Sequence, residues 1–451
     1  MAYRGRCALK GWLNTRKGCL SFDRSANPVI VHSSDRSLDR PTSKGEPVSV
    51  VPNGRTIMDV ICFSSQGWDN DLWTNKQHIM YRLAKRGIRV LYIDKDKGSL
   101  RKFIRQKNLW GISEIDENLC IGQSFRIPIR KLSSELKYYN EFGFKVDLIR
   151  RYAYACEDPL ILWVYHPGYG PYLKRIRRKA FVLYDCVDDY ASFPSYQGGK
   201  AKEWIVKAER SLLDISDLVI TSSENLYQEK RRLHSNTHLI HNVGDFSHFS
   251  QVLNRTFSVP DQLKDMRTPR IGFYGAISSY KVDLELIRFV ASERPNWSIC
   301  LMGPVGLGGG RTDVSGLNQL DNVTFTGKIS YQDLPRHISH MDVLMIPYRI
   351  TEHTKSVFPI KFFECLATGK PLVITPLPAL KGYYPYVEVG LSPTEFVERI
   401  EAVLQAESYE RRRDRIELAK KNDWNVRIDH ILQKIHNTAE MLESNVAGQD
   451  S

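Results

Sequence analysis

Long hydrophobic runs are missing from this chain of 451 residues. A helix that spans a bilayer needs about 20 consecutive apolar residues, whereas the longest apolar runs, residues 160–165 and 343–347, are only long enough for a strand. The N-terminal part also lacks the continuous apolar core of a secretory signal. We therefore predict a cytoplasmic protein, either soluble or attached peripherally to the inner face of the cell membrane.

Two common site motifs are also missing. The eight cysteines are scattered, with no C-x-x-C pair and no histidine at metal-binding spacing, which argues against a zinc site and is typical of reduced cytosolic thiols. The glycine-rich run 303–310 lacks the G-K-[ST] ending of a Walker loop. We interpret that run as a flexible loop.

Positive charge is abundant, with a formal net charge of +13 and an isoelectric point of about 9.2. Such a charge suits nucleic acid, acidic lipid headgroups or phosphorylated substrates, and its sign does not choose among them. Residues 1–55 hold ten basic and four acidic residues, a net +6, without hydrophobic periodicity. We predict a disordered basic extension over residues 1–56. Met58 opens the first strand pattern, and one hypothesis places the native start there.

Short apolar strands alternate with helical patterns from residue 58 to residue 376. The first group runs from a strand at 58–65 through the turn Gln66-Gly67-Trp68 to a helix over 75–84 and a strand at 90–94. Strand, helix, glycine and strand in this order predict a parallel βαβ unit. The pattern resumes after a polar linker at 251–268, so the sequence predicts two α/β domains.

The most informative stretch is SVFPIKFFECLATGKPLVITP, residues 356–376. It predicts a short helix that starts at Pro359 and is closed by Gly369. Lys361 and Glu364, three residues apart, share an exposed face near its start. A lysine at a helix N-terminus suits phosphate, and the carboxylate can accept hydrogen bonds from sugar hydroxyls, so we predict a nucleotide site. The alternative is an ordinary amphipathic helix with a surface ion pair.

The pattern P-x-K-x-x-E-x-L-A-x-G-K-P in this stretch resembles the donor-binding segment of group 1, or family 4, GT-B glycosyltransferases. The resemblance implies two doubly wound Rossmann-like α/β domains facing across a cleft. It also implies that Lys361 contacts the diphosphate and Glu364 the ribose of a nucleotide sugar. One departure is clear, because the first acid of the family's E-x7-E pair is replaced by Ser356, and Glu352 is out of register. The usual inference of a retaining mechanism is weakened accordingly.

Other candidate residues follow strand patterns, where ligands bind in open α/β sheets. His166 follows the strand at 160–165 and could act as a general base or steady a developing charge; capping a loop is its structural alternative. Asp188 and Asp189 could deprotonate an acceptor hydroxyl in an inverting enzyme, or serve as helix caps. Gln66, Gly67 and Trp68 are candidate acceptor-side residues, with a turn and a core tryptophan as the alternative.

In the second half, Gly275 ends a strand where a backbone can approach a ligand, and Lys281 could reach a phosphate. Residues 242–249 resemble the segment that closes the family's N-terminal domain. We predict an acceptor-side domain at 57–250, the linker at 251–268, a nucleotide-sugar domain at 269–408, and a C-terminal helix and tail at 409–451. By resemblance, the last helix crosses back near Asn422-Asp423-Trp424.

The predicted reaction moves a sugar from a nucleotide-diphosphate donor to a hydroxyl of a saccharide or lipid-linked acceptor, in bacterial surface polysaccharide synthesis. The resemblance implies no metal and no cofactor besides the co-substrate. The basic segment 173–179 could contact anionic membrane lipids or a lipid diphosphate, or be a solvated helix face. Nucleic acid is disfavoured because basic and aromatic residues are not interleaved. The alternatives are a GT-B epimerase or phosphorylase, and a degenerate nucleotide-binding protein.

Overall fold

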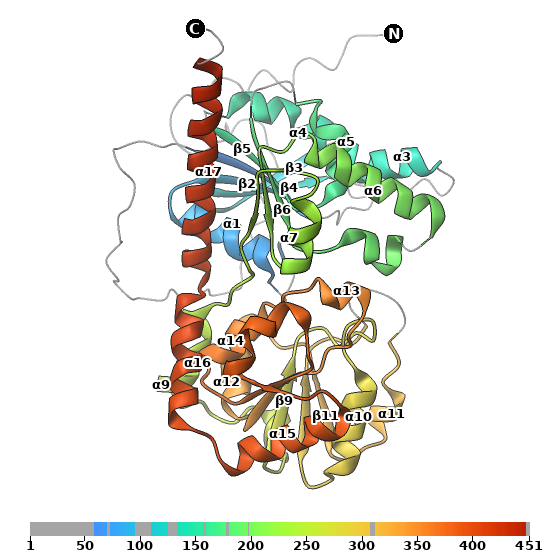
Figure 1. The fold of residues 1–451 in the computed structure, drawn as a ribbon, viewed down its shortest axis with the longest axis vertical. Helices are drawn as coiled ribbons and strands as arrows, with labels where there is room; N and C mark the ends of the chain where they lie inside the picture. Colours follow the sequence, from blue (N-terminus) through green and yellow to red (C-terminus); the bar gives the residue numbers. More distant parts are fainter. Residues whose placement is uncertain are drawn as a thin grey trace.

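The computed structural model describes residues 58–69, 73–94, 110–124, 133–156, 159–176, 180–196, 198–306 and 312–447. It consists of two units, one above the other in Figure 1, each built around its own sheet, with the long helix α17 (Trp424–Ala447) beside the upper unit. The predicted basic extension over 1–56 lies outside the described residues. So do Arg177, Arg178 and Lys179 of the basic segment.

The first unit contains an eight-stranded sheet with the order β3-β4-β2-β1-β5-β6-β7-β8. Every neighbouring pair is parallel except the antiparallel hairpin of β3 and β4 at the edge. The strands are β1 (Asp59–Phe63), β2 (Arg89–Ile93), β3 (Trp110–Asp116), β4 (Leu119–Ser124), β5 (Leu160–Val164), β6 (Phe181–Cys186), β7 (Leu218–Thr221) and β8 (Thr237–Leu239).

Both faces of this sheet are covered, which explains why its central strands are continuous apolar runs. Along β5, Trp163 packs into one core cluster while Leu162 and Val164 pack into the other. The helices of this unit are α1 (Asn75–Lys85), α3 (Ser134–Tyr138), α4 (Phe144–Ala155), α5 (Gly170–Leu173), α6 (Gly199–Leu213) and α7 (Glu224–Lys230). A π-helical turn, Tyr139–Gly143, joins α3 to α4.

The second unit contains a six-stranded sheet with the order β11-β10-β9-β12-β13-β14, parallel throughout. The strands are β9 (Arg270–Tyr274), β10 (Ser298–Met302), β11 (Val323–Gly327), β12 (Val343–Ile346), β13 (Leu372–Ile374) and β14 (Glu388–Val389). Its helices are α10 (Leu284–Glu293), α11 (Ser315–Asn318), α12 (Leu334–Ser339), α13 (Glu352–Lys355), α14 (Lys361–Ala367), α15 (Pro393–Gln405) and α16 (Tyr409–Lys421). Two doubly wound sheets are thus confirmed.

The connection between the sheets is not extended chain. It carries the short helices α8 (Phe246–Phe249) and α9 (Gln251–Asn254) and a 3-10 turn, Asp261–Leu263. All strands of the first sheet lie within the predicted domain 57–250, and all strands of the second lie within 269–408.

The C-terminal helices differ from the simple prediction of one helix over the last segment. Helix α16 packs on the second unit beside α14. The helical structure is interrupted at Asn422 and Asp423, and α17 then runs along the first unit (Figure 1). At the break, Gly244 donates its backbone N–H to the Asn422 carbonyl at 3.1 Å. The crossing therefore occurs at the sequence where the family resemblance placed it.

Candidate functional site

The stretch that dominates the sequence analysis forms α14 and β13, at the boundary between the two units. Gly369, with a φ of +69°, closes α14 as predicted. Pro359 does not start the helix, because it precedes the N-cap residue Ile360 and the helix begins at Lys361. Its carbonyl instead accepts a hydrogen bond from the Phe362 N–H at 3.0 Å. The predicted position of Pro359 was therefore wrong by two residues.

Lys361 projects into a cage of aromatic rings. Its ammonium donates to the Tyr348 hydroxyl at 2.9 Å and lies 4.5 Å from the centre of the Phe273 ring. Burial lowers the pKa of Lys361 to about 8. Because burial disfavours the charged form of this lysine, a bound anion would stabilise the ammonium and raise its pKa again.

Glu364 is also covered, with 5% of the residue exposed. Tyr274 donates its hydroxyl proton to a Glu364 carboxylate oxygen at 2.9 Å. Burial raises the pKa of Glu364 to about 8, although the Tyr274 hydrogen bond opposes the shift. The prediction of an exposed face shared by Lys361 and Glu364 was wrong for Glu364, which distant parts of the chain bury, whereas Lys361 is half-buried.

Gly275 lies directly against the Lys361 ammonium. A β-carbon built on Gly275 would lie 2.6 Å from Lys361 Nζ, and the residue has a φ of +118°. Both conditions favour glycine here. Lys281 approaches the same place, with its ammonium 5.6 Å from the Tyr348 ring that Lys361 also faces at 5.2 Å. The structure thus brings Gly275, Lys281, Lys361 and Glu364 together.

His166, which follows β5, is buried and held on both sides of its ring. The Gly168 N–H donates to Nδ1 at 3.0 Å, and Nε2 lies 3.2 Å from the Tyr196 hydroxyl. The rings of Phe142 and Tyr190 pack against it, with centroids 4.7 and 4.3 Å away. Proton abstraction by this ring would require the Tyr196 contact to open first.

The two aspartates after β6 have different surroundings. Asp189 accepts a hydrogen bond from the Ala191 N–H at 3.1 Å and caps the turn Tyr190–Ser192, which matches the structural alternative. The Asp188 carboxylate has no hydrogen bond or ion pair within the described part of the chain. Burial, and after it the charge of Asp188, raise the pKa of Tyr280 to about 12. The same charge opposes the lowering of the pKa of His353 by burial. Asp188 therefore lies near residues of the second unit.

The predicted acceptor-side residues form a tight turn after β1. Trp68 is buried against Trp73 and Tyr92, and its backbone N–H donates to an Asp94 carboxylate oxygen at 2.8 Å. The carbonyls of Gln66 and Gly67 accept hydrogen bonds from Tyr92 and Gln77 at 2.9 Å each. These contacts match the alternative of a turn and a core tryptophan, and an acceptor-side role stays a prediction.

The carboxyl ends of the two sheets face each other, as shown by direct contacts between the loops that follow them. Ser192, after β6, lies 3.1 Å from Nδ1 of His353, which follows β12. Ser356, at the position of the missing family acid, accepts from Asn225 at its hydroxyl (2.6 Å) and from Ser223 at its carbonyl (2.8 Å). The residue that departs from the family pattern thus joins the two units.

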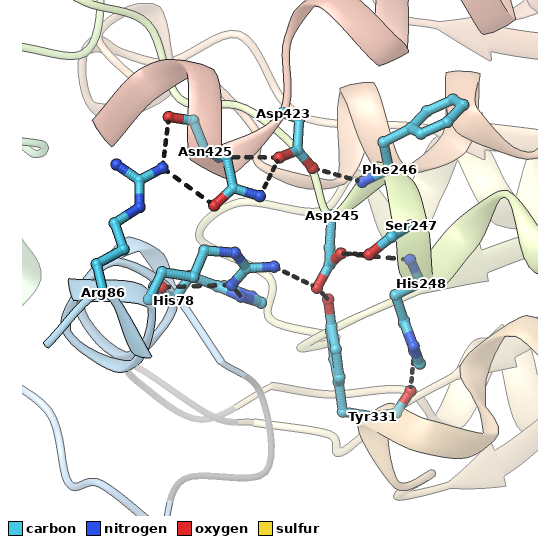
Figure 2. A network of polar contacts seen from close by, with 10 residues as sticks. His78, Arg86, Asp245, Phe246, Ser247, His248, Tyr331, Asp423 and Asn425 are labelled. Atoms are coloured by element: carbon cyan, nitrogen blue, oxygen red, sulfur yellow. Dashed lines mark hydrogen bonds and ion pairs between the residues drawn. The ribbon is translucent and has the colours of Figure 1, made fainter. Parts of the chain in front are cut away.

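A second set of contacts joins the units at the chain crossing (Figure 2). Asp245 pairs with Arg82 of α1 at 2.7 Å and accepts from the Tyr331 hydroxyl of the second unit at 3.4 Å. Burial acts to raise the pKa of Asp245, but the Arg82 guanidinium, with smaller contributions from His78 and His248, lowers it to about 2. His248 also reaches the second unit, with Nε2 2.8 Å from the Tyr331 carbonyl. This network links α1 of the first unit, through Asp245, to Tyr331 of the second unit.

The sequence reasoning missed Tyr274, Tyr348, His353 and Lys76. The two tyrosines end or follow strands and could have been found by the rule that selected Gly275. Lys76 lies within the first helix pattern, and the sequence gives no sign that the folded structure buries it. Within the described ranges no cluster of three or more His, Cys, Asp or Glu residues is placed to hold a metal.

Two doubly wound domains whose sheets present their carboxyl ends to each other, with a lysine, a carboxylate and a glycine turn on one side, define the GT-B class of glycosyltransferase. The sequence profile described as "Glycosyl transferases group 1" matches residues 268–406. TuaH of Bacillus subtilis (strain 168), assigned to teichuronic acid biosynthesis as a glycosyltransferase, is 31% identical over 287 residues, which cover 60% of this chain and 70% of TuaH. The chain belongs to the group 1 glycosyltransferases and is a transferase.

Solved structures share the fold at low sequence identity. Sucrose-phosphate synthase from Thermosynechococcus elongatus has a TM-score of 0.66 at 15% identity, covering 86% of this chain and 100% of that one. Anabaena HepE, solved with UDP and glucose, has a TM-score of 0.56 at 15% identity, covering 85% and 100%. The matches do not favour the epimerase, phosphorylase or degenerate alternatives. Within the described part of the chain, no helix is both long enough and apolar enough to cross a bilayer.

Proposed function

We propose that this transferase moves a sugar from a nucleotide-diphosphate donor to a hydroxyl of a saccharide or lipid-linked acceptor during bacterial surface polysaccharide synthesis. The observation that carries the donor half is the convergence of Gly275, Lys281, Lys361 and Glu364 where the sheets meet. TuaH, with its assignment to teichuronic acid biosynthesis, supports the acceptor half, and the structure solved with UDP and glucose supports a nucleotide donor.

The chemistry follows from the charges. Breaking the sugar–phosphate bond leaves negative charge on the diphosphate, and stabilising that charge lowers the barrier. Lys361 and Lys281 approach the same tyrosine ring and can both face this group. A bound diphosphate would raise the pKa of Lys361 from its free value of about 8 and keep it charged. Glu364, with a pKa of about 8, would lose its proton to accept hydrogen bonds from the ribose hydroxyls.

The acceptor hydroxyl must lose a proton as the new bond forms. Asp188, whose carboxylate has no partner in the described residues, lies near the second unit and is our candidate base. His166 and Asp189 are secondary candidates because their polar atoms are already engaged. The proposal involves no metal or other cofactor. It includes peripheral contact with an anionic membrane through the basic segment 173–179, of which Lys174 is exposed.

Isothermal titration calorimetry with UDP, GDP, dTDP and ADP tests the donor site. One nucleotide should bind selectively, and Lys361→Ala and Glu364→Ala should each weaken it by at least about tenfold, the loss of one charge-assisted contact. Lys355→Ala is the matched control, because Lys355 lies on the adjacent α13 and its ion pair within the described residues is with the exposed Glu352. Unchanged affinity in both site variants would remove the assignment.

A further inference from the structure

Lys76, at the second position of α1, is a buried cation that the proposed mechanism does not use. Only 2% of the residue is exposed. Among the described residues no carboxylate pairs with it, and its one hydrogen bond, to the neighbouring Asn75 side chain, is long at 3.4 Å. The Tyr165 ring lies 5.1 Å away. Burying an ammonium without a counter-ion costs folding free energy, which a purely structural residue would have no reason to retain.

The position of Lys76 is at the boundary of the two units. Its neighbour Asn75 contacts Asn242 at 3.4 Å, and Asn242 in turn donates to the Phe358 carbonyl at 3.0 Å, one residue before Pro359. Burial lowers the pKa of Lys76, Asp188 and Asp185 oppose that shift, and Lys281 of the second unit adds to it. Charges from both units therefore act on Lys76, those of the two aspartates favouring the ammonium and that of Lys281 opposing it.

A second buried lysine in the same unit shows what a structural lysine looks like. Lys230, at the end of α7, has 1% exposure and pairs with Glu209 and Glu229 at 2.8 Å each. Burial acts to lower the pKa of Lys230, but the neighbouring thiol and carboxylates raise it above its usual range. The two lysines are equally covered, but within the described residues only Lys230 has carboxylates at ion-pair distance, whereas Asp188 and Asp185 act on Lys76 without an ion pair.

We propose that Lys76 is a ligand-binding residue, which together with Lys281 holds an anionic oxygen group of a substrate between the two units. The inference rests on the proposed function and adds a contact from the first unit to a substrate that carries phosphate or carboxylate. The anionic group belongs either to the diphosphate of the donor or to a phosphate or carboxylate on the acceptor. In both cases a bound anion supplies the ion-pair partner that no carboxylate of the described residues gives to Lys76.

The first test compares Lys76→Met with Lys230→Met in the ligand-free protein by differential scanning calorimetry. Methionine keeps the chain length and removes the charge. Lys76→Met should raise Tm by about 2–4 °C, because the uncompensated cation is gone. Lys230→Met should lower it, because Glu209 and Glu229 lose their partner. A fall in Tm for Lys76→Met would mark a structural lysine and overturn the proposal.

The second test measures binding of inorganic pyrophosphate, glucuronate and glucose 6-phosphate to the wild-type protein, Lys76→Met and Lys230→Met. A loss of about tenfold or more for pyrophosphate in Lys76→Met alone assigns the donor diphosphate. The same loss for glucuronate or glucose 6-phosphate, with pyrophosphate unchanged, assigns an acidic acceptor. Equal binding of every probe to wild type and Lys76→Met, or no binding to wild type, would overturn the proposal.

The two failures are distinguishable. Failure of the donor site appears as unchanged nucleotide affinity in Lys361→Ala and Glu364→Ala, whatever happens at Lys76. If turnover falls in Lys76→Met while affinity for all three anions is unchanged, Lys76 acts on Asp188 and not on a ligand, which also overturns the proposal.

Discussion

The contact between α17 and the first sheet and the boundary between the two units both bury charge, but in opposite ways. Under α17, Arg427 and Asp185 are both fully buried, lie 3.2 Å apart and form an ion pair. The Trp163 indole N–H donates to the other Asp185 oxygen at 3.2 Å, and Arg427 also donates to the carbonyls of Ile240 and His241. Each charge in this region has its complement within the chain.

At the boundary Arg82 and Asp245 also form an ion pair, but the charged groups beside α14 and at the start of α1 have no ion-pair partner among the described residues. Lys361 donates to a neutral tyrosine, Glu364 accepts from another, and Lys76 has no carboxylate partner in the described residues. Burial consequently brings the pKa values of Lys361 and Glu364 to about 8 from opposite directions. A buried ion pair such as that of Arg427 and Asp185 holds a helix in place, whereas buried charged groups without an ion-pair partner can bind a ligand of opposite charge.

The largest expected effect on stability comes from breaking the buried ion pair of Arg427 and Asp185. Arg427→Met should lower the free energy of unfolding by about 3–5 kcal/mol, because it leaves Asp185 as an uncompensated buried carboxylate. Urea unfolding followed by tryptophan fluorescence measures it. The double variant with Asp185→Asn should recover part of the loss, since the orphan charge is then absent. Equal losses in the single and double variants would contradict the pairing as the cause.

An intermediate effect is expected from the pH dependence of Glu364. Its pKa is raised from 4.5 to about 8, so the folded state keeps a proton that the unfolded state releases. The stability from Glu364 is therefore fully present below pH 4.5 and lost as the pH rises to about 8, at up to about 1.4 kcal/mol per pH unit.

Urea unfolding midpoints at pH 5, 6.5 and 8 measure this dependence. The difference between wild type and Glu364→Gln isolates it, because glutamine does not titrate. Lys361 has the opposite sign, since its pKa falls from 10.5 to about 8 and stability rises with pH between those values. A wild-type slope that persists unchanged in Glu364→Gln would show that other groups cause it.

The smallest effect should come from Glu352, the acid that lies out of register with the family pair. Its side chain is 86% exposed and pairs with Lys355 at 2.6 Å. Glu352→Ala should change stability by less than about 0.5 kcal/mol, because exposed pairs contribute little. Donor affinity by calorimetry should stay within about twofold, which is less than half a kcal/mol. A tenfold loss would instead make Glu352 the replacement for the missing acid.

Much of the fold could be predicted from the chain because its signals are local. Apolar runs specified the central strands, and Gly369 specified the end of α14. The spacing of Lys361 and Glu364 placed both on one side of that helix. The hairpin of β3 and β4 was not predicted, since WGISEID and LCIGQS mix polar and apolar residues without a clear run. The positions of His166 and Asp188 after strands were also correct.

The sequence by itself determined which residues follow each strand, where the helices end, and that a lysine and a glutamate share one face of α14. Only the tertiary structure decided that Glu364 is buried on this face and that Ser356 joins the two units. It also decided that Lys76 is buried with no carboxylate partner among the described residues, while Lys230 has two. Pairing and pKa depend on what distant segments bring within a few ångströms, as with Arg427 and Asp185, 242 residues apart in the chain. The spacing of neighbouring residues in the sequence does not show which distant residues will come into contact.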